Sequence, residues 1–319
     1  MKASLRTWVL VGLLALLAAV PTLAAWLNEP FYLDLMRRVM IFAIAAASLN
    51  LILGYGGMVS FGHAAYLGIG AYAVGILGFY GIHDGWLQWG VAIGASALVA
   101  LAIGAVSVRT SGIYFIMITL AFTQMLYYLG VSLAEYGGDD GLRLSSRSQF
   151  PGVMDLADAA SFYYLVLGLL AGTLLLVHRL VNSRFGRVIR AARSNEARTR
   201  ALGLSPYPYR LAAFVIAGAI CGLAGALLVN QTSFLTPEFM NWTRSGELMF
   251  MVILGGIGTA SGPLLGAAAL LLLEDLLQGW SVLPKAVTEH WQLYLGLILV
   301  LVVLYAKRGL AGLIPGKHE

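Results

Sequence analysis

The sequence predicts an all-α polytopic membrane protein with eight to ten transmembrane helices and glycine-rich broken segments. Three observations support this fold class. Hydrophobic residues make up 60% of the chain and charged residues 11%, whereas soluble domains average about 45–50% and about 25%. The mean hydropathy is +0.83. Long apolar runs recur along the whole sequence, and a soluble protein of this size has no means of burying so much apolar surface.

The first apolar run covers residues 8–27 and follows Lys2 and Arg6, which is also the charge pattern of a signal peptide. As a helix its 20 residues extend roughly 30 Å, enough to cross the hydrocarbon core. The core of a signal peptide is about 7–15 residues long, and no clean A-x-A cleavage site follows this run. We therefore expect a retained transmembrane helix here.

Nine further apolar runs bring the number of predicted spans to ten. Those at 39–53 and 246–257 are short and lie beside glycine-rich turns, so each is also compatible with a half-helix. Eight full spans with re-entrant segments are the alternative. The other runs are 63–80, 87–107, 113–131, 162–180, 211–229, 263–283 and 291–306.

Charges between the runs predict the orientation. Residues 179–210 carry eight arginines and Glu196 as their one acid, whereas residues 132–161 carry five acids and two arginines. Positive residues concentrate on the cytoplasmic side of membrane proteins. We therefore expect one transmembrane domain over 1–319, with a cytoplasmic loop at 181–210, an external loop at 132–161 and both termini in the cytoplasm.

The remaining positive residues mostly agree with ten spans, although Arg37 and Arg38 fall on the external side and depart from the rule. This topology also explains the isoelectric point of about 9.3, so we expect no nucleic-acid partner. The single cysteine, Cys221, excludes an intramolecular disulfide. The residues placed in the cytoplasm are Lys2, Arg6, Arg109, Lys307, Arg308 and Lys317.

Two glycine-rich segments resemble each other at a distance of 201 residues. "LILGYGGMVSFG" at 51–62 and "VILGGIGTASGP" at 252–263 align without gaps and share five of twelve residues. So short an apolar match is equally compatible with chance. If it is a true repeat, it marks two related halves, each with a backbone break, as in transporter folds whose broken helices lie near the substrate path.

The cytoplasmic segment has more order than a membrane anchor needs. Residues 184–203, "RFGRVIRAARSNEARTRALG", hold six arginines and one acid, and an anchor requires only such charge. Ser194 or Asn195 is positioned as the N-cap of a short helix. Glu196 follows in its first turn, and Gly203 stands at its end. A short helix rich in arginine and small residues is suited to docking on a soluble partner.

Three motifs resemble a known family. "NEARTRALG" at 195–203 looks like the E-A-A…G signature in the cytoplasmic loop of permeases of ATP-binding-cassette (ABC) importers. The wider segment 183–204 is similar to branched-chain amino acid permeases of the LivM type, as are the glycine-rich segments 49–72 and 252–267. These segments cover about a fifth of the chain, in matching order and spacing. Arg198 departs from the pattern, because it replaces the second alanine.

The resemblance implies an ABC importer permease bundle in the bacterial inner membrane. The implied partners are a second homologous permease, two cytoplasmic ATPase subunits, an external solute-binding protein and the lipid bilayer. The sequence lacks a G-x-x-x-x-G-K-[ST] motif, so the energy for transport must come from a partner or an ion gradient. ATPase coupling is assigned to Arg193, Ser194, Glu196, Ala197, Arg198 and Gly203.

Polar residues in two apolar segments are candidates for the translocation path. Six glycines between positions 54 and 72 allow helices to pack closely or to break within the membrane. The alternative is plain helix packing, with His63 hydrogen-bonded to a neighbouring carbonyl. Threonines often bond back to their own helix, whereas Gln124 needs a partner in the membrane. The candidate path residues are Gly57, Ser60, Gly62, His63, Thr119, Thr123 and Gln124.

Leu, Ile and Val are the substrates that the resemblance implies first, and urea, short amides and aromatic acids stay open. An ion-coupled secondary transporter needs ionisable residues near the midplane, but Glu247, Glu274 and Asp275 are not central in their spans. An intramembrane serine hydrolase needs a serine with a histidine base. Ser60 and His63 are three residues apart, without a G-x-S-x-G or H-E-x-x-H motif. We expect a permease with no catalytic residue, cofactor or metal site.

Overall fold

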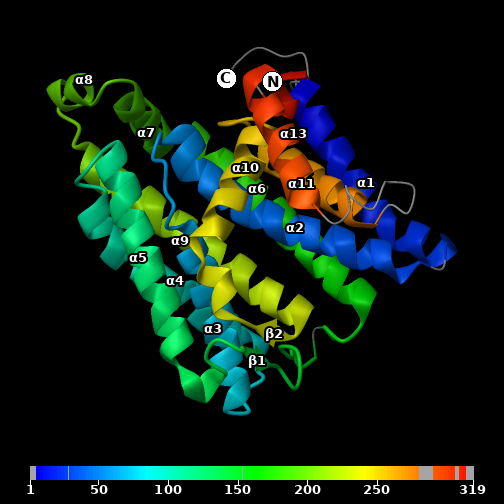
Figure 1. The fold of residues 1–319 in the computed structure, drawn as a ribbon. Helices are drawn as coiled ribbons and strands as arrows, with labels where there is room; N and C mark the ends of the chain where they lie inside the picture. Colours follow the sequence, from blue (N-terminus) through cyan, green and yellow to red (C-terminus); the bar gives the residue numbers. More distant parts are fainter. Residues whose placement is uncertain (1–4, 28, 153, 280–289, 306–308, 314–319) are drawn as a thin grey trace.

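The computed structural model describes residues 5–27, 29–152, 154–279, 290–305 and 309–313, most of which are helical (Figure 1). The helices are α1 (Leu5–Leu27), α2 (Pro30–Asn50), α3 (His63–Phe79), α4 (Gly85–Ser107), α5 (Ile113–Ser132), α6 (Ala159–Asn182), α7 (Arg184–Ser194), α8 (Glu196–Ala201), α9 (Pro206–Thr232), α10 (Trp242–Gly255), α11 (Gly262–Gly279) and α13 (Trp291–Tyr305). The short elements are the π-helical turn η1 (Leu51–Tyr55), the 3-10 turns η2 (Ala134–Tyr136), η3 (Pro237–Met240) and η4 (Leu310–Leu313), and strands β1 (Leu142–Arg143) and β2 (Phe234–Leu235).

Each apolar run predicted from the sequence coincides with a helix, which confirms the all-α polytopic fold class. Five helical segments of the described chain are long and apolar enough to cross a membrane, and shorter apolar helices cover Trp8–Ala24, His63–Phe79 and Trp291–Val302. The first run packs as a helix of the bundle, because the Tyr163 hydroxyl on α6 donates to the Leu17 carbonyl at 2.8 Å. Outside the described residues lie positions 280–283 and 306 of the predicted runs, together with Lys2, Lys307, Arg308 and Lys317.

The half-helix interpretation of residues 39–53 is wrong. Helix α2 begins at Pro30 and continues through η1, so the helical segment Pro30–Tyr55 is 26 residues long. The charged residues in its first turns lower the local hydropathy, so the apolar run in the sequence begins only at residue 39. Arg37 is nevertheless buried: it forms an ion pair with Asp34 and lies 4.7 Å from the ring centroid of Phe162 on α6. By contrast α10 has 14 residues, fewer than the ~20 of a full span.

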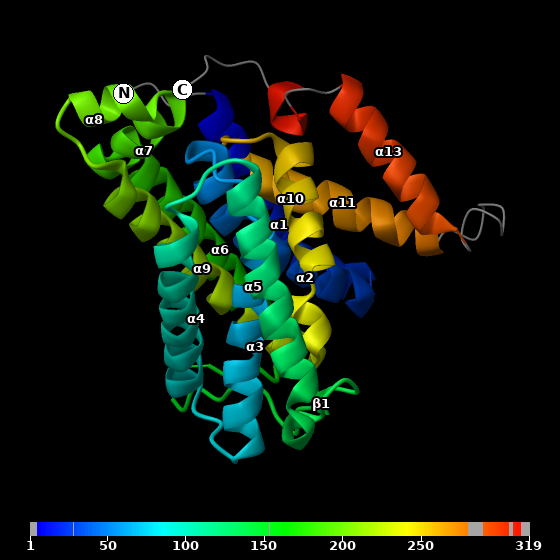
Figure 2. The same cartoon turned by 60° about the vertical axis from the view of Figure 1, so that its left-hand side comes forward.

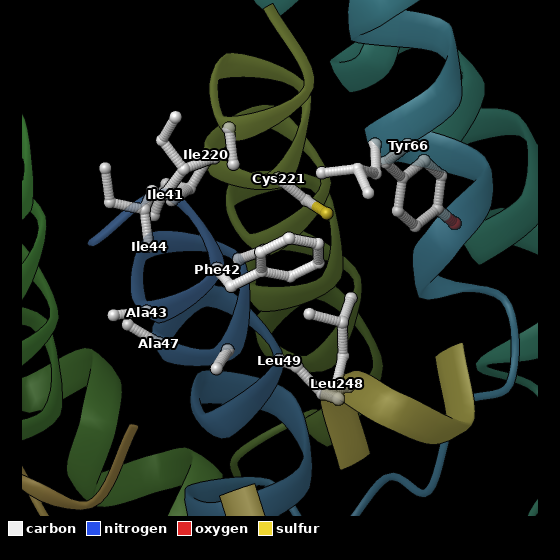
Figure 3. Packing of buried hydrophobic residues seen from close by; sticks show 14 of the residues in the cluster. Ile41, Phe42, Ala43, Ile44, Ala47, Leu49, Tyr66, Ile220, Cys221 and Leu248 are labelled. Carbon is white, nitrogen blue, oxygen red and sulfur yellow. The ribbon is translucent and has the colours of Figure 1, made fainter. Parts of the chain in front are cut away.

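The core forms where α2, α3, α9 and α10 meet (Figure 3). Every residue of α2 from 39 to 50 is buried, and Phe42, Cys221 and Leu248 belong to the same apolar cluster. Glycines bring α3 and α9 into backbone contact: a Cβ on Gly70 would overlap the Gly222 carbonyl. Such close approach is the usual role of small residues between membrane helices.

The two loops of opposite charge lie at opposite ends of the helix bundle. Helices α7 and α8 are at one end and strand β1 is at the other (Figure 2). Arg109, in the connection between α4 and α5, lies 5.6 Å from the ring centroid of Tyr207 and so belongs to the α7–α8 end. The β1–β2 ribbon, paired Leu142↔Leu235 and Arg143↔Phe234, is a small addition to the expected all-α fold. The predicted topology requires the two charged loops to lie at opposite ends of the bundle, as they do here.

Candidate coupling site at two helix breaks

The first glycine-rich segment is a break between α2 and α3. Helix α2 ends in the π-helical turn η1, a distortion that often marks functional positions. Gly57 follows with φ +69°, a conformation that disfavours residues with a side chain. Helix α3 then starts at His63 with Gly62 as its N-cap residue. Residues 56–62 therefore form an irregular link inside an otherwise helical region.

The second glycine-rich segment forms an equivalent break between α10 and α11. Helix α10 ends at Gly255 and α11 begins at Gly262. Gly258, which aligns with Gly57 in the sequence, also has a positive φ, of +73°. The matching glycine conformation at matching positions favours the repeat interpretation over a chance resemblance.

Asn50, the last residue of α2, holds the two breaks together. Its Oδ1 accepts from the Gly258 N–H at 2.9 Å, and its Nδ2 donates to the Thr259 carbonyl at 3.0 Å. The backbones also touch, since a Cβ on Gly54 would lie 2.6 Å from the Gly258 nitrogen. Asn50 is not among the candidate residues predicted from the sequence. A signal was present, because an amide within a long apolar run needs a polar partner.

Cavities border both breaks. One of about 100 Å³ lies between residues 56–59 and the α4–α5 connection, with Arg210 in its wall. Another of about 260 Å³ lies between residues 258–261 and helices α1, α6 and α7, with Arg190 in its wall. The breaks therefore have free space beside them, at the end of the bundle that carries the arginines.

Helix α8 has the caps predicted from the sequence. Of the two candidate N-caps, Asn195 takes the role: its side chain accepts from the Arg198 N–H at 2.9 Å. Ser194 instead ends α7, where its hydroxyl donates to the Arg190 carbonyl at 3.2 Å. Gly203 has φ +80° and stops the helix in the left-handed conformation.

Glu196 fastens α8 to the start of α9. Its carboxylate pairs with Arg200 at 2.5 Å and with Arg210 at 2.7 Å. Partial burial acts to raise its pKa, but the hydrogen bonds and charges of Arg210 and Arg200 outweigh this and hold the pKa below its ordinary value. On the outer face of the α8 region Ala197 and Arg198 are exposed, and Leu202 is 73% exposed. This face is free to contact a partner.

Arg193 turns toward the first break instead of sharing that outer face. Its guanidinium donates to the Gly54 carbonyl in η1. Its aliphatic stem lies against Gly57, where an added Cβ would come within 2.8 Å of Arg193 Cγ. The last turn of α7 is thus in direct contact with the irregular end of α2.

The structure brings three of the candidate path residues together at the contact between the first break and α5. The Phe61 N–H donates to Thr119 Oγ1 at 3.3 Å, and the Gly62 N–H donates to Ser60 Oγ at 3.1 Å. A Cβ on Gly62 would lie 3.1 Å from Thr119 Cβ. Thr123 bonds back to the Thr119 carbonyl at 2.9 Å on the same helix face.

The other candidate path residues lie elsewhere. His63 has no exposed surface and faces α2, where its Nε2 is 2.7 Å from the Ser48 hydroxyl. The helix-packing alternative named a backbone carbonyl as the partner of His63, whereas in the structure the partner is a serine hydroxyl. Gln124 is partly exposed on α5, and its Oε1 is buried without a partner among the described residues. Gly57 lies beside Arg193, at the end of the bundle that carries α7 and α8.

A family model described as "Branched-chain amino acid transport system / permease component" matches residues 31–304. The chain is 30% identical to the high-affinity branched-chain amino acid transport system permease protein LivM of Salmonella typhimurium, over 93% of this chain and 74% of that protein. It is 28% identical to LivM of Escherichia coli K12, over 94% and 74%. It is 24% identical to the permease protein LivH of the same Escherichia coli strain, over 85% and 91%. No solved structure matches the chain at a significant level.

Proposed function

The chain belongs to the family of permease components of branched-chain amino acid transport systems, and on this basis we propose that it is the membrane-spanning permease of an ABC importer. It resides in the bacterial inner membrane and carries Leu, Ile, Val or related small solutes. Separate subunits hydrolyse ATP, because the chain lacks a P-loop.

The proposed complex contains a second, homologous permease, two cytoplasmic ATPase subunits and an external solute-binding protein. Support for two permeases comes from the names of the relatives. LivM and LivH of Escherichia coli K12 are both called permease proteins of a high-affinity branched-chain amino acid transport system, and both match this chain. A system with two such permeases pairs related chains in one membrane.

The contact between Arg193 and Gly54 carries our proposal for coupling. The exposed outer face of α8, at Ala197, Arg198 and Leu202, docks on the ATPase. Glu196 and Arg210 hold α8 on α9, so the docked helix moves with its neighbours. Arg193 transmits that movement to the π-helical end of α2. A permease responds only when its contacts differ between two ATPase states, and a rigid link of this kind supplies the difference.

The breaks serve as hinges in this mechanism. Gly57 and Gly258 have the conformational freedom that a hinge uses, and the cavities beside them give room for movement. The translocation path runs along the contact of the first break with α5, where Ser60, Gly62 and Thr119 meet. Substrate passes there when the hinges open.

Reconstitution in liposomes tests the proposed function. We expect ATP-dependent uptake of leucine only when the chain is combined with its partner permease, ATPases and binding protein. Uptake by the chain alone, driven by an ion gradient, would identify a secondary transporter instead. Urea and short amides, offered to the same complex, test the substrate.

The proposed orientation has a separate test. Ser194 is the last residue of α7, and Ser145 lies in the loop after β1, at the other end of the bundle. Cysteines introduced at these positions should react with impermeant reagents from opposite sides. The native Cys221 is buried and should stay silent. Labelling of both positions from one side contradicts the topology.

A further inference from the structure

A small cavity lies at the end of the bundle opposite α7 and α8. It has a volume of about 150 Å³ and is enclosed by α2, α3, α9, η3 and α10. Thr232 in its wall is two residues from the ribbon strand β2 and accepts from the Phe234 N–H at 3.4 Å. By the proposed orientation this is the external side. The lining residues are Arg38, Phe42, Leu67, Leu228, Thr232, Phe239 and Arg244.

Arg38 is the feature of this cavity that the fold does not explain. The charge of the neighbouring Arg37 is paired with that of Asp34. No acidic side chain among the described residues pairs with Arg38, which lies 5.8 Å from the ring centroid of Phe42. A cation on the external side also has no topological use, since positive residues concentrate on the cytoplasmic side. Charged residues inside transmembrane segments are costly and generally functional.

The second cation of the cavity is largely compensated. Arg244 on α10 pairs with Glu247 at 2.7 Å, and both side chains are partly exposed. The hydroxyl of Thr232 is also in use, because it donates to backbone carbonyls, such as that of Leu228 at 3.0 Å. Within the described part of the chain, Arg38 therefore contributes a positive charge without an acidic partner, and its guanidinium donates no hydrogen bond there. A site with this charge selects an anionic group.

The rest of the wall is apolar. Side chains from four different elements form a hydrophobic surface beside the two guanidinium groups: Phe42, Leu67, Leu228 and Phe239. An apolar cavity of about 150 Å³ can hold a benzene molecule, so a space of this volume can receive a short aliphatic side chain. An aliphatic side chain of three or four carbons is smaller than benzene. A ligand with a carboxylate at one end and a short branched chain at the other matches both parts of the wall.

We propose that this cavity is an external entry subsite for a small aliphatic amino acid, with Arg38 binding the carboxylate and the apolar wall receiving the side chain. The inference rests on the proposed import function, because the site would receive the substrate before it reaches the first break. Arg38 would then recognise the α-carboxylate that all candidate amino acids share, and the wall would favour branched over polar side chains.

Direct binding to the assembled complex in lipid nanodiscs, without the binding protein, tests the site. The probe is radiolabelled leucine, with 4-methylpentanoate and leucinamide as competitors. We expect 4-methylpentanoate, which keeps the carboxylate, to displace leucine, and leucinamide, which lacks it, to fail. Arg38→Gln should weaken leucine binding by about tenfold or more, and Arg38→Lys should weaken it less. The matched control is Arg143→Gln, which removes a charge at the same end of the bundle from a residue that does not line the cavity.

Three results would overturn the proposal. Equal leucine binding by the Arg38→Gln complex and the unaltered complex would show that Arg38 does not bind the carboxylate. Weaker capture of the binding protein by Arg38→Gln, with leucine binding unchanged, makes Arg38 a protein-docking residue. Dependence on anionic lipid in the nanodisc, without dependence on leucine, makes the cavity a lipid headgroup site. Normal assembly and basal ATPase activity of the Arg38→Gln complex exclude misfolding of the variant. ATP-dependent leucine uptake by the unaltered complex tests the proposed function separately from the entry subsite.

Discussion

The two helix breaks have the same backbone design but different neighbours. In both, a helix ends beside a glycine of positive φ, at Gly57 and Gly258. The first break contacts α7 through Arg193 and α5 through Thr119. The second is held by Asn50 and is covered near η4, where a Cβ on Gly309 would lie 2.6 Å from the Gly256 nitrogen.

The difference indicates a division of roles between the breaks. The first receives a contact from α7 and is placed to respond to it. The second reaches the first through Asn50, whose amide bonds Gly258 and Thr259. Two similar hinges that share one amide would move together, and Arg193 connects the first of them to α7. Substitutions in the two breaks should therefore affect transport in different ways.

The largest effect is expected at Gly62, where the first break meets α5. A Cβ there already lies 3.1 Å from Thr119 Cβ, so Gly62→Leu should separate α3 from α5 and abolish uptake or assembly. Gly62→Ala is the graded control and should retain part of the activity. Uptake of leucine in reconstituted complexes is the measurement. Normal uptake by the leucine variant would mean that this close contact is incidental.

The next effect is expected from Arg193→Ala, which removes the link between α7 and Gly54. Leucine uptake should fall about tenfold, because a hydrogen bond to a charged donor contributes roughly 1.5–3 kcal/mol, while basal ATP hydrolysis continues. The matched control is Arg187→Ala, one arginine removed from the same helix. Equal loss of uptake in both variants would show that only the charge of α7 matters.

A smaller effect, of a different kind, is expected from Asn50→Ala. The Gly258 N–H and the Thr259 carbonyl lose their partners, which costs about 1–3 kcal/mol for a buried group. Thermal unfolding of the purified complex should therefore start at a lower temperature. Uptake should fall only in proportion to the folded protein. A strong loss of coupling at unchanged stability would make the second break an equal partner of the first.

The smallest effects are expected in α8. Gly203→Val places a β-branched residue at φ +80° with open space around it, which costs about 1–2 kcal/mol and should reduce coupling while membrane insertion stays intact. Glu196→Ala should act more weakly. Since the folded-state pKa of Glu196 is lowered from 4.5, its contribution is fully present above that pH and is lost only as the pH falls through the lower folded value. Unchanged coupling of ATP hydrolysis to uptake in both variants would mean that this segment serves only as a membrane anchor.

The sequence alone determined the local features of this protein. Hydropathy located each membrane helix, because burial in lipid is decided by consecutive residues. The order of Asn195, Glu196 and Gly203 predicted a short capped helix, since caps and left-handed stops depend on backbone groups only a few residues away. If the alignment of Gly57 with Gly258 is a true repeat, it predicts two breaks, and both glycines adopt a positive φ. Only charged turns, as at Arg37, concealed the start of α2.

The tertiary structure decided which distant groups meet. Arg193 and Gly54 are 139 residues apart, and Asn50 and Gly258 are 208 apart. The imidazole of His63 on α3 meets the Ser48 hydroxyl of α2, a partner that the sequence around either residue does not indicate. Each of these polar groups carries a local need for a partner. Which partner satisfies that need depends on how the helices cross, because a contact between remote segments follows from the packing of the whole bundle and has no counterpart in the neighbouring sequence.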